Sequence, residues 1–108
     1  MPTVRLDGRK ITDWPSFHHE SQAIFGFPDF YGRNMSAWID SLSSLRDGDG
    51  MSAFTLAPDE TLQIELINHA VLRSNAPHIF DAIEECTAEV NERYTESGEK
   101  PALRLVLN

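Results

Sequence analysis

The sequence predicts a small α/β domain in which three parallel strands are joined by pairs of helices. Short apolar or alternating runs occur near the start, the middle and the end of the chain, and apolar residues at helical spacing fill both intervals. Parallel strands need long crossover connections, which these helical intervals supply. The 108 residues fit a single domain spanning residues 1–108, with about four helices packed on the sheet.

The first strand and the first helix are marked by alternation and by capping residues. Residues 3–6 alternate and include β-branched side chains, and Asp7 and Gly8 then mark a turn. Thr12 or Asp13 can cap the helix that follows, which Gly26 ends. Its apolar face is predicted at helical spacing, with Pro15 in the first turn: Trp14, Phe17, Ser21, Ile24 and Phe25.

An aromatic loop separates the first helix from the second. Residues 26–32 hold three aromatic rings and one proline between two glycines, a composition that favours an ordered loop. Asn34 can cap a second helix running to about Leu45. Its apolar stripe recurs at spacings of three and four: Met35, Trp38, Ile39, Leu42 and Leu45.

The second half contains the remaining strands and helices. The apolar runs at residues 51–56 and 61–66, separated by a turn, are compatible with a hairpin that would add an extra strand near 51–56. Asn68 can start a short third helix, and a fourth runs from after the break at residues 74–77 to Gly98. Residues 102–107 are nearly all apolar, which predicts a strand covered on both sides or central in its sheet.

The charge of the chain bears on the class of partner. Nine Lys and Arg residues stand against seventeen Asp and Glu residues, which gives a formal net charge of −8. Such a field repels nucleic-acid phosphates and attracts cationic protein surfaces, although solubility alone accounts for it equally well. We therefore expect no direct binding to nucleic acid.

Cysteine content and hydropathy predict where the chain works. Cys86 is the one cysteine and has no internal disulfide partner, which is compatible with a reducing compartment. No apolar run reaches the roughly 18 residues that span a bilayer, and the first ten residues have no apolar signal core. We expect a cytoplasmic protein that does not bind membranes.

Catalytic, metal and cofactor motifs do not assemble in the sequence. His18 and His19 are adjacent and leave a helix in different directions, whereas a zinc pair on a helix needs a spacing of about four. Cys86 falls on the apolar stripe of the fourth helix, where burial raises the pKa of a thiol. An enzyme would require Asp13, His18 or Asp29 to converge on one pocket. We expect no cofactor, no metal and no enzymatic activity.

One run resembles the signature of a known family. Residues 27–42 read F-P-D-F-Y-G-R-N-M-S-A-W-I-D-S-L and resemble, without a gap, the barstar-family pattern L-P-x-Y-Y-G-x-N-L-D-A-L-W-D-x-L. The resemblance implies a barstar-like domain with a three-stranded parallel sheet packed on helices. It also implies an inhibitor, or immunity protein, that binds and occludes the active site of a basic, barnase-like ribonuclease.

The resemblance also assigns residues to the partner-binding surface. Asp40 stands at the family's key carboxylate position, and Phe30 stands where the family has a tyrosine. Ser36 replaces a family aspartate one turn before Asp40, and Arg33 brings positive charge to the loop. The implied partner-binding residues are Phe30, Tyr31, Gly32, Asn34, Ser36, Asp40 and Glu85.

Two other interpretations remain open at this point. In the first, the loop aromatics only close the core, Asn34 is a helix cap and Asp40 is a solvated helix residue. In the second, the fold is kept but the target differs, which would make the chain an acidic protein-interaction or regulatory domain with a non-nuclease target. The departures at Arg33 and Ser36 favour the second. In the inhibitor interpretation the free chain is a monomer that binds one-to-one.

Overall fold

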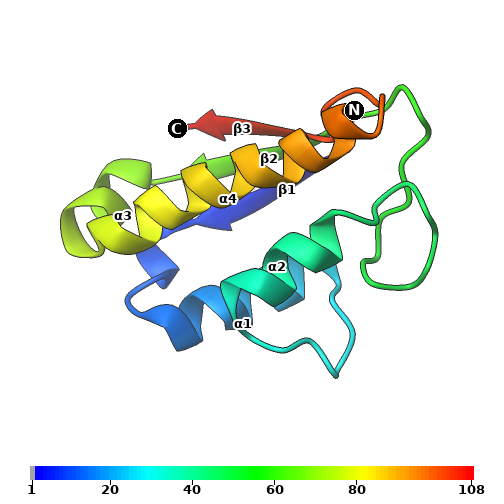
Figure 1. The fold of residues 1–108 in the computed structure, drawn as a ribbon. Coiled ribbons are helices and arrows are strands. Elements are labelled where there is room, and N and C mark those ends of the chain that lie inside the picture. Colours follow the sequence, from blue (N-terminus) through cyan, green and yellow to red (C-terminus); the bar gives the residue numbers. More distant parts are fainter. Residues whose placement is uncertain (1) are drawn as a thin grey trace.

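The computed structural model describes residues 2–108 and confirms the predicted alternation of strands and helices (Figure 1). The elements follow one another as β1 (Thr3–Asp7), a short 3₁₀ helix (Gly8–Lys10), α1 (Trp14–Phe25), α2 (Met35–Leu42), β2 (Leu62–Ile67), α3 (His69–Asn75), α4 (Pro77–Glu96) and β3 (Leu103–Leu107). Within residues 2–108 no helix is both long and apolar enough to cross a membrane.

The three strands form one parallel sheet in the order β1-β2-β3, with helices on one face (Figure 1). Val4, Ile64 and Leu105 are aligned across the sheet, and these side chains point into the core. The neighbouring row pairs Arg5 with Glu65 on the opposite face, where the side chains reach solvent. The alternation of apolar and polar positions therefore fixes the register and assigns one face to the helices.

The hairpin near residues 51–56 was a wrong prediction. Residues 51–56 contain no strand, because both edges of β2 are already occupied by β1 and β3. The backbone of this segment instead bonds to helix ends and loops: Ala53 N donates to Phe25 O at 2.9 Å, and Leu56 N donates to Leu45 O at 2.8 Å. A central strand of a parallel sheet has no free edge for a hairpin partner.

The placement expected for the final strand was also wrong. β3 is an edge strand, covered on one face, with Arg104 exposed and Leu107 39% exposed. Its apolar run arises because Leu103 and Leu105 face the core, while Val106 lies opposite Glu65 in the next row. A five-residue strand with four apolar residues does not distinguish a central strand from an edge strand that carries one apolar residue on its open face.

Helix α2 ends at Leu42, three residues before the predicted end. The Tyr94 hydroxyl donates to Leu42 O at 3.1 Å and accepts from Leu45 N at 2.9 Å. Leu45 is still buried as the stripe predicted, but its amide bonds to this side chain from α4 and not to a carbonyl in a continuing helix. A tertiary contact therefore ends the helix.

The helix starts and stops show how side chains set these boundaries. Asp13 begins α1 as predicted, with Ser16 N donating to Asp13 Oδ1 at 2.9 Å. Asn68 precedes α3, but it has a positive φ of 54° and its side chain donates to Asp7 Oδ1 at 2.9 Å and does not cap the helix. Gly26 ends α1 in the left-handed conformation, with φ 68°.

Replacing Gly26 by Ala is expected to destabilise the protein through two separable effects. The left-handed backbone costs an alanine about 1–2 kcal/mol, and the new Cβ would lie 2.4 Å from Ala53 Cβ. Gly98→Ala is the matched control, because φ is +80° there and nothing lies within 4 Å. Urea unfolding should show a larger loss for Gly26→Ala, partly recovered by adding Ala53→Gly. Equal losses at the two glycines would contradict the contact.

Candidate functional site

The aromatic loop between α1 and α2 divides its rings between the core and the solvent. Phe27 stacks on Phe25, with ring centroids 5.2 Å apart, and Tyr31 packs against Phe27 at 4.6 Å. Phe27 and Tyr31 are buried, whereas Phe30 is 75% exposed. The interpretation in which all the aromatic side chains close the core therefore fails for Phe30.

A buried polar contact anchors the same loop to α1. His18 Nδ1 and the Tyr31 hydroxyl oxygen are 2.6 Å apart, and both side chains are buried. Burial, helped by the nearby Arg33 charge, lowers the pKa of His18 below its usual 6.5. Burial also raises the pKa of Tyr31 above its usual 10. The pair is therefore neutral near pH 7.

The loop leads into α2 through Asn34. Ala37 N donates to Asn34 Oδ1 at 2.8 Å, so Asn34 caps the helix as predicted. Its Nδ2 donates to Gly32 O at 3.3 Å. Arg33 between them has a positive φ of 53°, and its Nη2 donates to Gln22 Oε1 at 3.1 Å. The structure thus gives Gly32 and Asn34 roles in shaping the loop.

Helix α2 presents one polar side to solvent. Trp38, Ile39 and Leu42 are buried, while Ser36 and Asp40 are exposed. The Asp40 carboxylate is not alone: Arg93 Nη1 from α4 lies 2.9 Å from Asp40 Oδ1. Packing of the apolar side fixes the direction in which the helix projects its polar side chains.

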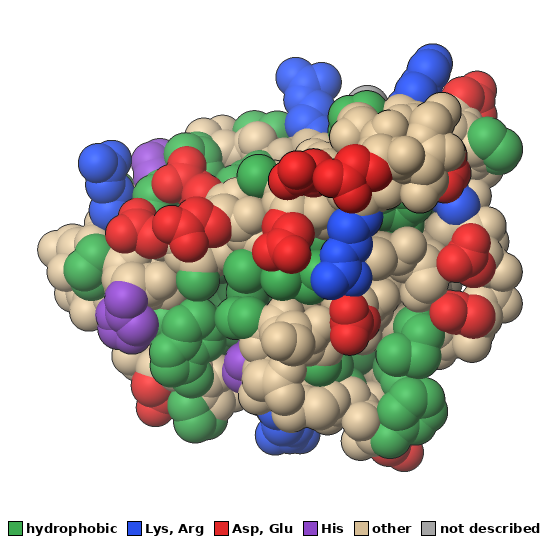
Figure 2. All heavy atoms as spheres, viewed as in Figure 1, with side chains coloured by type: hydrophobic (Ala, Val, Ile, Leu, Met, Phe, Trp, Pro, Cys, Tyr) green, Lys and Arg blue, Asp and Glu red, His purple; other side chains and the backbone are tan. Residues whose placement is uncertain are grey.

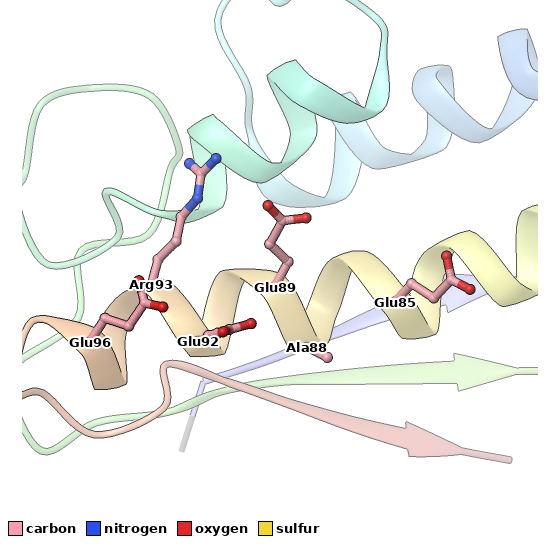
Figure 3. A pocket seen from close by; sticks show the side chains of 6 residues that line it. All are labelled: Glu85, Ala88, Glu89, Glu92, Arg93 and Glu96. Carbon is pink, nitrogen blue, oxygen red and sulfur yellow. The ribbon is translucent and has the colours of Figure 1, made fainter.

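Acidic side chains line the neighbouring surface of α4. A shallow hollow of about 460 Å³ is formed there by Glu85, Ala88, Glu89, Glu92, Arg93 and Glu96, which we call the α4 acidic surface (Figure 3). Figure 2 shows red acidic side chains following α4, with a basic side chain among them. Glu85 thus belongs to a larger group of acids on α4. Arg93, which lies among these acids, connects the group to Asp40 on α2.

The sequence interpretation missed most of this surface. Glu89, Glu92 and Arg93 were not predicted as site residues, although acids recur at positions 85, 89, 92 and 96, spaced by three or four residues. That spacing places them on one side of a helix. The position of Arg93 against Asp40 depends on the packing of α4 with α2, which no local pattern reveals.

The residues considered for catalysis do not share a site. Asp13 caps α1, and His18 is buried against Tyr31. Asp29 lines a separate shallow hollow with His19, Gln22, Ala23, Phe27 and Arg33, which includes neither Asp13 nor His18. Within residues 2–108 no group of three or more His, Cys, Asp or Glu side chains could hold a metal ion.

The cysteine behaves as the sequence predicted. Cys86 is half-buried on α4 and packs against the core. Burial raises the pKa of its thiol, and the charges of Glu89 and Glu85 raise it further. The thiol therefore stays protonated near pH 7.

Stability should fall as the pH drops below about 6.5, because of His18. The pKa of His18 is lowered in the folded state, so the unfolded chain takes up a proton first as pH falls. A proton bound only by the unfolded chain lowers the free energy of unfolding by about 1.4 kcal/mol per pH unit. Urea unfolding at pH 7.5 and 5.5 should show a drop that shrinks in His18→Asn. His19→Asn, at an exposed neighbouring position, should keep the full drop. An unchanged drop in His18→Asn would contradict the assignment.

Comparison with known proteins identifies a family match across nearly the whole chain. A family model described as "Barstar (barnase inhibitor)" matches residues 1–106. A search of curated proteins found no significant match.

Proposed function

The chain belongs to the barstar family, and we propose that it is an inhibitor, or immunity protein, that binds and occludes the active site of a barnase-like ribonuclease. The family description names inhibitors of barnase. The proposal assigns the contact to the aromatic loop, the exposed side of α2 and the α4 acidic surface. Binding is one-to-one, by a monomer in the cytoplasm, and needs no cofactor or catalysis.

The exposure of Phe30 is the observation that carries the proposal. Its ring is 75% exposed, although the neighbouring rings of Phe27 and Tyr31 are buried. An isolated loop could turn such a ring inward, but Tyr31 and Asn34 tie the loop to α1 and α2. Exposed aromatic rings held on a fixed scaffold are enriched at the centres of protein interfaces.

Charge complementarity supports a ribonuclease as the partner. A ribonuclease must hold phosphate groups with cationic side chains, and a carboxylate can occupy a phosphate position through charge-assisted hydrogen bonds. Such carboxylates are offered by Asp40, on the helix that follows Phe30's loop, and by the α4 acidic surface beside that helix. The rule that such charges steer and anchor association was drawn partly from barnase and barstar themselves, so here it is an analogy within the family.

Helix α2 is held in place at both ends and along its buried side, which favours tight binding. Asn34 caps α2 at its start, and the Tyr94 hydroxyl bonds to the backbone at its end. Trp38 and Leu42 are fully buried beneath it. A surface that is already ordered before binding loses less conformational entropy on association.

Two departures from the family pattern favour a different target. Ser36 offers a hydroxyl where the family has an aspartate, and Arg33 places a cation on the loop. The alternative is an acidic protein-interaction domain with the same fold and a non-nuclease target. Inhibition of RNA cleavage, measured alongside binding, distinguishes the two.

Asp40→Ala should weaken binding to a barnase-like ribonuclease by about 2–5 kcal/mol, because a desolvated cationic site in the partner would lose its carboxylate. Asp81→Ala, at an exposed acid of α4 outside the α4 acidic surface, is the matched control and should cost under about 1 kcal/mol. Isothermal calorimetry and an RNA-cleavage assay measure both. If Asp40→Ala binds as wild type does, the assigned mechanism is wrong.

Phe30→Ala should separate binding from stability. Because Phe30 is 75% exposed, its truncation should change the free energy of unfolding by no more than about 0.5 kcal/mol. Losing a ring that becomes buried in the complex should weaken binding by about 1.5–3 kcal/mol. Phe27→Ala, at a buried position on the same loop, should instead destabilise the fold by about 3–5 kcal/mol. A Phe30→Ala protein that unfolds easily, or binds normally, would contradict this division.

A further inference from the structure

Asp40 is engaged by a cation of its own chain. Arg93 Nη1 lies 2.9 Å from Asp40 Oδ1 and 3.4 Å from Ser43 Oγ. The Ser43 hydroxyl donates to Ile39 O at 2.6 Å, so its oxygen is free to accept from Arg93. The guanidinium thus lies at the C-terminal end of α2, where the helix dipole favours a positive charge.

Arg93 is also an exception within its helix. The 20 residues of α4 contain six acids, Asp81, Glu84, Glu85, Glu89, Glu92 and Glu96, and Arg93 is the one Lys or Arg among them. Figure 3 shows its side chain extending from α4 toward α2, away from Glu92 and Glu96. A surface suited only to attract cations would not need a guanidinium at this position.

The Asp40–Arg93 pair is weak enough to exchange. The Asp40 side chain is 67% exposed and the Arg93 side chain is 45% exposed, so solvent weakens the attraction between their charges. An exposed ion pair of this kind changes the equilibrium constant between its paired and separated states by only about 1.5- to 5-fold. A cation brought by a partner in a desolvated interface can therefore replace Arg93 at Asp40.

We propose that Arg93 is a specificity-determining residue that occupies Asp40 in the free protein and competes with the cations of a partner for it. This inference rests on the proposed function, since it takes Asp40 as the carboxylate that a cationic active site receives. A partner then binds tightly only if it delivers a stronger cation to Asp40 and leaves room for the displaced guanidinium. Arg93 thereby discriminates against surfaces that carry only scattered positive charge.

Arg93→Gln should raise the affinity for barnase, used as the probe, because the internal competitor is lost. Removing any positive charge also strengthens attraction to a cationic partner, so Arg104→Gln is the matched control, on the open face of the sheet. Arg93→Gln should exceed Arg104→Gln by about 1.5- to 5-fold in affinity. Arg93→Lys should restore most of the wild-type value, and circular dichroism should show that every variant is folded.

The decisive measurement repeats both substitutions in an Asp40→Asn background. Competition predicts that the extra gain from Arg93→Gln disappears there, since Asp40 no longer carries the charge over which the cations compete. A gain that persists, or one equal to that of Arg104→Gln, would reduce the effect to net charge and overturn the proposal. Weaker binding by Arg93→Gln would also overturn it, because Arg93 would then contact the partner directly.

A second probe keeps this inference separate from the identity of the partner. A tetra-arginine peptide is titrated into wild type, Arg93→Gln and Arg104→Gln while the backbone amide of Asp40 is followed by NMR. Competition predicts tighter peptide binding at Asp40 in Arg93→Gln than in Arg104→Gln, and equal binding refutes it. If no variant binds or inhibits barnase, the proposed function fails on that target, and the peptide titration still decides the role of Arg93.

Discussion

The packing of Phe27 and Tyr31 against α1 is the constraint on which the geometry of the candidate site depends. The Phe27 ring stacks on Phe25, the Tyr31 ring packs at a tilt against Phe27, and the Tyr31 hydroxyl is hydrogen-bonded to His18 Nδ1. The side chains of Phe27 and Tyr31 point inward, whereas Phe30 between them is 75% exposed. The same anchoring delivers Asn34 to the start of α2. Burial of two aromatic side chains thus orients both the exposed ring and the helix that carries Asp40.

A second anchor holds the other end of α2. Tyr94 from α4 bonds to the backbone of Leu42 and Leu45, and Arg46 lies over its ring, 5.1 Å from the centroid. The Arg46 side chain is only 5% exposed and donates to the carbonyl oxygens of Glu60 and Lys100. These bonds tie α2, the segment leading to β2 and the approach to β3 to one helix. They explain why the end of α2 has a defined position although residues 43–60, which follow it, lack helices and strands.

The sequence predicted the helices and strands better than it predicted the tertiary contacts between them. Local signals were sufficient where one side chain sets a boundary, as Asp13, Gly26 and Asn34 do. They failed where a distant residue decides. The Tyr94 hydroxyl, 52 residues from Leu42, ends α2, and the pairing of β2 on both edges excludes a strand at 51–56. In the site, the family resemblance placed Asp40 on α2, but its pairing with Arg93 depends on helix packing across 53 residues. Exposure of Phe30 among buried aromatics likewise follows from packing and not from composition.

The side chains that stabilise the fold are separate from those of the proposed binding surface. The side chains that hold α2 in place, Trp38 and Leu42, have no exposed surface, whereas Asp40 and Arg93 are both exposed and their pair contributes little to folding. Substitutions on the outer side of α2 and on α4 therefore change the charge pattern without disturbing the core. Ser36 is exposed on that same outer side. Because binding to a cationic site depends on where each carboxylate lies and on which cation already pairs with it, one scaffold can be adapted to different cationic partners by changing a few surface charges.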